Sequence, residues 1–150
     1  MALKEILNAD IKTAMLARDS LTLDTLNGVK TAITYEEVAQ KIRDTGLDDP
    51  AIEALIVRES KKRDEAAELF DRGGNHEAAE KERAEKEILK KYLPQQLSEA
   101  EIKALVTEAI TQTGATEVKD MGRVIGAVKA KAGNAADGGL VAKLAREALQ

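Results

Sequence analysis

Cysteine and tryptophan are absent from this sequence, and histidine occurs once, as His76. The lack of cysteine excludes disulfides, thiolate zinc sites and cysteine nucleophiles. A single histidine excludes a cluster of imidazole ligands and leaves at most one imidazole base. We therefore predict no metal site, no bound cofactor and no catalytic residue.

Aromatic residues are also scarce, being limited to Tyr35, Phe70 and Tyr92. The core must therefore be built from Leu, Ile, Val and Ala. The length of 150 residues, with 43% hydrophobic and 33% charged residues, is enough for one domain of average size or two small ones. Charged residues recur every few positions near the N-terminus, so we expect a cytoplasmic protein without a signal peptide or membrane anchor.

The composition favours helix along nearly the whole chain, because there are two prolines and abundant Ala, Leu, Glu and Lys. No stretch shows the alternation of a strand, so the predicted fold class is all-α. Apolar residues recur at three- and four-residue spacing from Leu3 to Met15, which predicts a first amphipathic helix. A second helix is predicted from an N-cap at Ser20 to a C-cap at Gly46.

The next two helices have clear start and stop signals. Asp49 is the expected N-cap of a helix that has Pro50 at its first position and ends at Gly73-Gly74. Asn75 is the expected N-cap of the helix that follows.

Three shorter helices are predicted in the last third of the chain. Ser98 and Glu101 form a capping-box pattern that begins a helix ending at Gly114. A second helix covers residues 118–132, and a third begins near Asp137.

A boundary between two domains is predicted at Pro94-Gln95-Gln96, because proline cannot continue the preceding helix. Residues 1–93 are expected to form an N-terminal helical domain of long helices, of the hairpin type. Residues 97–150 are expected to form a small C-terminal three-helix bundle, in which neighbouring helices pack antiparallel.

The sequence offers little for catalysis. None of its serines lies in a G-x-S-x-G pattern, and it has no glycine loop of the nucleotide-binding kinds. The carboxylates of Glu77, Glu80 and Glu87 have no histidine or aromatic neighbours that would tune their pKa values, so we interpret them as a solvated face. Catalysis by this chain alone is not predicted.

Charge is balanced in the middle of the chain and basic toward its end. Residues 58–91 contain ten basic and ten acidic residues, which predicts mutual pairing. The run Lys61-Lys62-Arg63 has acidic neighbours and is interpreted as a solvated face. Residues 121–146 carry five basic residues and one acidic residue, a local charge of +4 in a chain of net charge −4. These basic residues are Arg123, Lys129, Lys131, Lys143 and Arg146.

A glycine face is predicted on the helix over residues 118–132. A periodicity of about 100° per residue places the apolar residues Met121, Ile125, Val128 and Ala132 on one side. It places Gly122, Gly126 and Ala130 on the other side, with Lys119 and Arg123 beside them.

Glycine inside a helix costs roughly 0.5–1 kcal/mol relative to alanine, so this face needs a reason. Either another helix packs closely there, or the backbone of a partner such as a phosphodiester chain approaches and is held by Lys119 and Arg123. A weaker anion site is predicted at the next helix start, where Gly138 and Gly139 present free N–H groups but Asp137 competes for them.

Several segments of this sequence resemble the GatB/YqeY family, and the resemblance extends over the whole chain. The first helix and the charged run after it are similar to the family through Asp10, Lys12, Ala14, Met15, Asp19 and the segment Glu59–Arg63. The later matching segments are Tyr92–Ser98, Lys119–Val124 and Ala136–Val141.

The resemblance implies a two-part helical fold whose C-terminal part is similar to the tail of the B subunit of the glutamine-dependent aminoacyl-tRNA amidotransferase. That tail helps to hold the tRNA, and the family is associated with carbon–nitrogen ligase activity that uses glutamine as the amide donor. The resemblance implies tRNA-backbone contacts at Lys119, Arg123, Lys129, Lys131 and Lys143, and places of close approach at Gly122 and Gly138. The glycine face adds Gly126 to this predicted nucleic-acid site. The residues for ATP, metal or glutamine chemistry have no counterpart here.

Two hypotheses remain open. In the first, the chain is a tRNA-binding accessory module related to the amidotransferase. In the second, it is a helical protein–protein adaptor that docks a synthetase or an amidotransferase subunit, and the glycine face is a helix-packing surface.

Overall fold

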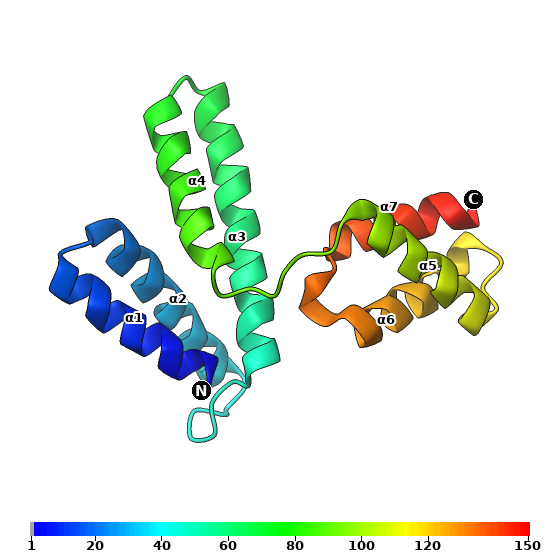
Figure 1. The fold of residues 1–150 in the computed structure, drawn as a ribbon, viewed down its shortest axis with the longest axis horizontal. Helices are drawn as coiled ribbons and strands as arrows, with labels where there is room; N and C mark the ends of the chain where they lie inside the picture. Colours follow the sequence, from blue (N-terminus) through cyan, green and yellow to red (C-terminus); the bar gives the residue numbers. More distant parts are fainter. Residues whose placement is uncertain (1) are drawn as a thin grey trace. The chain divides into compact units, whose positions relative to one another are not determined.

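The computed structural model describes residues 2–150, and this part of the chain contains helices and no strand, which confirms the all-α prediction. The contacts divide the chain into two compact units that meet in sequence at Leu93 and Pro94. Figure 1 labels the helices of both units.

The first unit is built from two helical hairpins. One hairpin pairs α1, Leu3–Ala17, with α2, Ser20–Ala39. The other pairs α3, Asp49–Arg72, with α4, His76–Lys90. The α2 helix contacts both helices of the second hairpin, and a shared core of leucine, isoleucine and valine fills the region between them.

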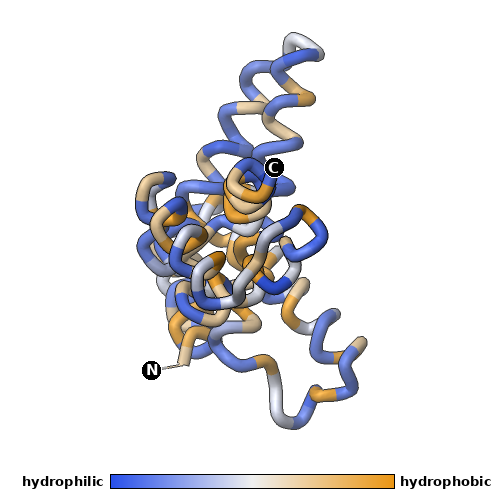
Figure 2. Tube along the Cα trace, turned by 90° about the vertical axis from the view of Figure 1, so that its right-hand side faces the viewer, coloured by the Kyte–Doolittle hydropathy of each residue, from blue (hydrophilic) through white to orange (hydrophobic). Residues whose placement is uncertain are grey.

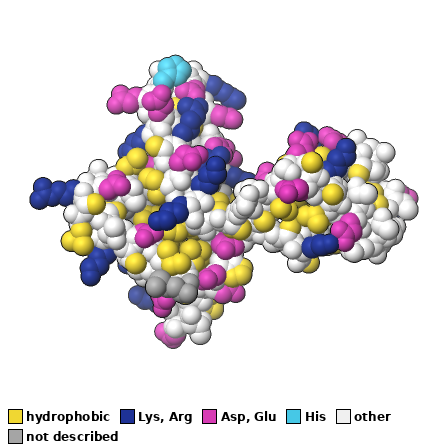
Figure 3. All heavy atoms as spheres, in the orientation of Figure 1, with side chains coloured by type: hydrophobic (Ala, Val, Ile, Leu, Met, Phe, Trp, Pro, Cys, Tyr) yellow, Lys and Arg dark blue, Asp and Glu magenta, His cyan; other side chains and the backbone are white. Residues whose placement is uncertain are grey.

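The core of the first unit lies at one end of the α3–α4 hairpin. Ile52, Ile56 and Leu89 are completely buried there. Farther along the hairpin, the buried residues are the small Ala67 and Ala79, so the distal half of this hairpin buries little apolar surface. Figure 2 shows that its projecting end is coloured mainly as hydrophilic, and Figure 3 shows acidic and basic side chains mixed over it.

The end of α2 differs from the prediction. The helix ends at Ala39 rather than at Gly46. Lys41 takes the left-handed conformation with φ 59°, and the N–H of Ile42 donates to the carbonyl of Glu37 at 2.9 Å. This is a Schellman motif with lysine where glycine is usual, so no glycine marks the helix end in the sequence.

Buried Glu37 explains why the chain turns back at this point. Its carboxylate accepts from Lys4 Nζ at 2.6 Å and from the backbone N–H of Leu47 at 3.1 Å. These bonds tie the loop after α2 to the start of α1, and Gly46, with φ 76°, belongs to this loop.

Two predicted N-caps are displaced by one residue. Asp19, not Ser20, accepts from the N–H of Thr22 at 3.2 Å. Asp48, not Asp49, accepts from the N–H of Ala51 at 3.0 Å. The carboxylate of Asp49 instead accepts from the N–H of Leu3, the first residue of α1, at 3.0 Å.

The second unit contains α5, Glu99–Thr113, α6, Met121–Ala132, and α7, Gly138–Leu149. Each of these helices packs against the other two around a core that includes Ile102, Val106, Val124, Val128 and Leu144. Short 3-10 turns, Val118–Asp120 and Gly133–Ala135, lie on either side of α6. The first three residues of the predicted helix over 118–132 therefore form a 3-10 turn.

Most predicted helix ends of this unit are confirmed. Ser98 and Glu101 form the complete capping box of α5, and Gly114 ends that helix in the left-handed conformation. Asp137 is the N-cap of α7. In the first unit, Asn75 caps α4 as predicted and accepts from the N–H of Ala78 at 3.1 Å.

Candidate nucleic-acid interface

The glycine face of α6 is open. Val124 and Val128 are buried on the core side of the helix, with Met121 and Ile125 partly buried beside them. A Cβ atom added at Gly122 or at Gly126 would meet no other atom within 4 Å. No other part of the second unit, residues 94–150, therefore packs closely on this face.

Lys129 lies on the same side of α6 as the two glycines, because it follows Gly126 by three residues and Gly122 by seven. Its side chain is exposed and makes no ion pair within residues 2–150. Lys143, on α7, is also exposed and unpaired within this part of the chain. These two lysines are positive charges that no neighbour neutralises.

Arg123 points toward the end of α5. Its Nη1 donates to the carbonyl of Thr113 at 3.1 Å, and its Nη2 lies 2.9 Å from Asp120 Oδ1. Thr113 is the last residue of α5, whose carbonyl groups have no partner within the helix. The guanidinium therefore joins the end of α5 to the start of α6.

Asp120 is the acceptor that organises this connection. Its Oδ2 accepts from the backbone N–H groups of Thr116 at 3.0 Å and Glu117 at 3.1 Å. The Thr116 hydrogen bond, with Arg123 and the Glu117 bond, lowers the pKa of Asp120 to about 2. The carboxylate is therefore ionised at neutral pH and binds Arg123 as a charged partner.

Two other predicted contact residues are paired with acidic neighbours. Lys119 Nζ lies 3.1 Å from Glu117 Oε2, and Lys131 Nζ lies 2.6 Å from Glu108 Oε1. Both lysine side chains remain more than half exposed, at 74% and 57%. Such surface ion pairs contribute about 0–1 kcal/mol each, so a phosphate could replace the carboxylate at little cost.

At the start of α7, one backbone N–H group already has an acceptor within the chain. Gly138 is exposed, and an added Cβ would meet no atom within 4 Å. The side chain of Asp137 nevertheless accepts from the N–H of Gly139 at 3.3 Å. The carboxylate therefore competes with any anion for this helix end, as the sequence indicates.

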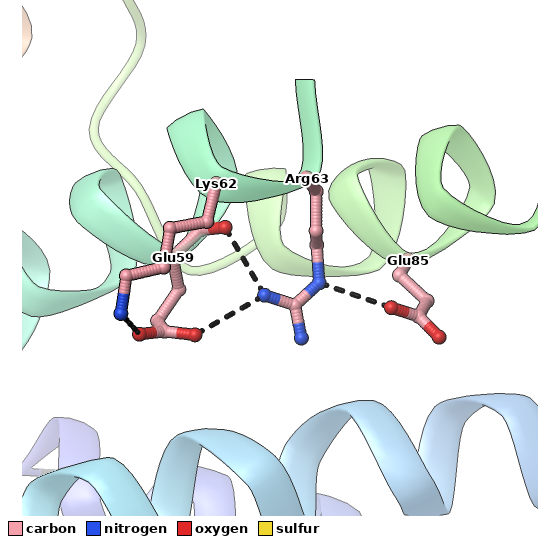
Figure 4. Close-up of polar contacts among 4 residues, drawn as sticks. All are labelled: Glu59, Lys62, Arg63 and Glu85. Carbon is pink, nitrogen blue, oxygen red and sulfur yellow. Dashed lines mark hydrogen bonds and ion pairs between the residues drawn. The ribbon is translucent and has the colours of Figure 1, made fainter. Parts of the chain in front are cut away.

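Arg63, interpreted from the sequence as part of a solvated face, is largely buried instead. Its side chain is only 12% exposed, and Nε donates to Glu85 Oε2 of α4 at 3.2 Å (Figure 4). Nη1 donates to the carbonyl oxygen and to the carboxylate of Glu59 at 3.0 and 3.3 Å. The motif Glu59–Arg63 therefore links the two helices of a hairpin, and only part of it, such as Lys62, is a solvated face.

Sequence reasoning missed the acidic partners of the basic residues. The Arg123–Asp120 pair has helical i, i+3 spacing and could have been found in the sequence. The Lys131–Glu108 pair joins two helices and is separated by 23 positions, so only the packing of α5 on α6 reveals it.

No helix among the described residues has the length and apolar character needed to cross a membrane. The same part of the chain contains no group of three His, Cys, Asp or Glu side chains arranged to hold a metal ion.

Comparisons with known proteins show what this chain is similar to. One protein from Lachancea thermotolerans, called altered inheritance of mitochondria protein 41, mitochondrial, is 34% identical over 108 residues. The match covers 71% of this chain and 57% of that protein, so the chain spans little more than half of its relative. Since the relative's name places it in mitochondria, the cytoplasmic location stays a prediction for this chain. The sequence profile described as Yqey-like protein matches residues 4–149, and the chain therefore belongs to the YqeY family.

Proposed function

We propose that the second unit binds the phosphate backbone of a tRNA through the glycine face of α6, and that the chain is an accessory module for tRNA-dependent chemistry. The observation that carries this proposal is the open surface at Gly122 and Gly126, which lies beside the unpaired Lys129. Small side chains let the backbone of a nucleic acid approach closely, and a nearby positive charge attracts its phosphates. This face offers the two together.

We rank the proposed contacts by whether each basic side chain already has an acidic partner. Lys129 and Lys143 are free to meet a phosphate directly. Lys119 and Lys131 must first leave their acidic partners, and Arg123 holds α5 and α6 together. We therefore assign Lys129 and Lys143 as the principal phosphate contacts, Lys119 and Lys131 as secondary ones, and Arg123 as a positioning residue.

The test is the affinity of the full-length chain for tRNA between 50 and 200 mM salt, measured by fluorescence anisotropy. Three to five phosphate contacts predict a slope of log affinity against log salt of about −2 to −4.5. The double variant Lys129→Glu with Lys143→Glu should reduce the affinity at least tenfold. Lys103→Glu reverses one charge at an exposed position of α5 and should have a much smaller effect.

A second variant tests the role of close approach. Gly126→Gln fills the open face without changing the charge and should weaken tRNA binding while leaving the fold intact. Absence of binding at 50 mM salt, or an equal loss in Lys103→Glu and in the double variant, would contradict the proposal.

A protein–protein adaptor is the second candidate, because an exposed face of small residues also lets a partner helix approach closely. The partner would be a synthetase or an amidotransferase subunit. Such a complex should persist at high salt and should also be weakened by Gly126→Gln. Retention at high salt with no change in Lys129→Glu would favour this candidate over tRNA binding.

A further inference from the structure

A cleft of about 310 Å³ lies in the first unit. The second half of α1, the start of α2 and the last part of α4 meet around it. This volume is at the lower end of the range typical of pockets for small molecules. Its lining combines small apolar side chains with charged ones and hydroxyl groups, and includes Asp10, Thr13, Ala14, Ala17, Asp19, Thr22, Glu87, Ile88, Lys91 and Tyr92.

The charges around the cleft are mainly negative. Asp10, Asp19 and Glu87 line it, against the single basic residue Lys91. Lys91 Nζ lies 3.1 Å from Asp10 Oδ2, so it neutralises that carboxylate. Asp19 keeps its negative charge while it caps α2 through the N–H of Thr22. Glu87 makes no hydrogen bond or ion pair with the described residues 2–150.

The helices add to this negative potential. The α1 helix ends at Ala17 and the α4 helix ends at Lys90, so two helix C-termini lie next to the cleft. A helix C-terminus carries a partial negative charge of about half an elementary charge. The N-terminus of α2, which Asp19 caps, carries a partial positive charge, so the helix ends together add only a small negative potential to that of the three carboxylates. A positively charged ligand therefore fits this cleft, and an anion does not.

A metal ion is a poor fit, because no three of these side chains are arranged as ligands in the described chain. An organic cation matches the lining better. Its ammonium groups would donate to carboxylates, and its carbon chain would contact apolar side chains. Two carboxylates, of Asp19 and Glu87, have no basic partner, which matches a ligand with two amino groups.

We propose that this cleft binds a small aliphatic diamine. One ammonium group contacts Glu87, the other contacts Asp19, and the alkyl chain packs on Ala14, Ala17 and Ile88. This site is separate from the glycine face of α6 and does not depend on tRNA binding.

The test is an NMR titration of the full chain with 1,4-diaminobutane, followed at the backbone amides. Saturable shifts should be concentrated at residues 13–22 and 87–92. Neutral 1,4-butanediol has a similar length and should cause no such shifts. Glu87→Gln should weaken diamine binding about tenfold, which corresponds to about 1.4 kcal/mol. Glu77→Gln removes a charge at the other end of α4 and should leave the affinity unchanged.

A variant with the opposite effect makes the test sharper. Lys91→Gln removes the cation that neutralises the carboxylate of Asp10. The cleft then carries one more uncompensated negative charge, so diamine binding should become several times tighter. Weaker binding in Lys91→Gln would overturn the proposal. So would shifts that spread over all acidic surfaces without saturation, an equal response to butanediol, or no response to the diamine.

Discussion

The hydroxyl group of Tyr92 donates to Asp10 Oδ2 at 2.5 Å, and this bond joins the end of the first unit to its first helix. Tyr92 is buried, with 7% of its surface exposed, and Lys91 lies 5.5 Å from the centre of its ring. The contact connects two of the segments that resemble the family, the first helix and the segment Tyr92–Ser98. It therefore gives both segments a structural role.

Tyr92→Phe should lower the free energy of unfolding of the first unit by about 1.5–3 kcal/mol, because a hydrogen bond to a charged acceptor is lost. Denaturant unfolding followed at amide resonances of α1 and α4 measures this. Tyr35→Phe is the matched control, because Tyr35 is 74% exposed and its hydroxyl makes no hydrogen bond within residues 2–150. Equal losses in the two variants would contradict the assignment.

The same contact predicts a pH window. The Tyr92 bond lowers the pKa of Asp10 below 3.8, so its stabilising effect is present above pH 3.8 and is lost as the pH falls further. Burial raises the pKa of Tyr92 above 10, so its contribution is full below pH 10 and is lost as the pH rises. Asp10→Asn should reduce both dependences, which pH-dependent unfolding curves would measure.

Asp120→Asn should destabilise the connection between α5 and α6. The pKa of Asp120 is lowered from 3.8 to about 2, mainly by the Thr116 N–H, so its stabilising effect is present above pH 3.8 and disappears as the pH falls to about 2. The variant should therefore unfold at a lower denaturant concentration than the wild type at pH 7, and the difference should shrink at pH 2. A constant difference across this range would contradict the role given to the carboxylate.

Gly126→Ala should raise the stability of the second unit by about 0.5–1 kcal/mol, because the added methyl group meets no atom and the unfolded chain loses freedom. Gly114→Ala is the control with the opposite sign. Gly114 has φ 68°, a left-handed conformation that alanine adopts at a cost, so this variant should lose about 1–2 kcal/mol of stability. Thermal unfolding of both variants measures these shifts. Destabilisation by Gly126→Ala would show that the face is not open.

Ser60→Ala should stabilise the first unit by about 1 kcal/mol. The hydroxyl of Ser60 is buried and has no hydrogen-bond partner among the described residues, and such a group costs about 1–3 kcal/mol. Denaturant unfolding of the variant tests this directly. A loss of stability would show that the hydroxyl has an acceptor.

Helix content and several helix ends follow from local sequence signals. Several caps bond to groups only a few positions away in the sequence, so their roles could be predicted. They are Ser98, Glu101, Gly114 and Asn75. The end of α2 could not, because Lys41 replaces the usual glycine and the loop is held by distant Lys4.

Part of the candidate site could likewise be predicted from the local sequence, and part could not. The exposed side of α6 follows from its periodicity, and Gly122 and Gly126 lie where the sequence places them. The pairing of Lys131 with Glu108 and the cleft beside Glu87 depend on how separate helices pack. A single sequence contains no local signal for such contacts.

Because the distal half of the α3–α4 hairpin buries little apolar surface, we expect it to open more readily than the rest of the first unit. Only small residues such as Ala67 and Ala79 are buried there, whereas Ile56 and Leu89 belong to the main core. Opening the distal half therefore exposes little apolar surface and leaves that core intact. Amide hydrogen exchange should accordingly be fastest near Gly73-Gly74 and should slow steadily toward Ile56, so the hairpin frays from its tip.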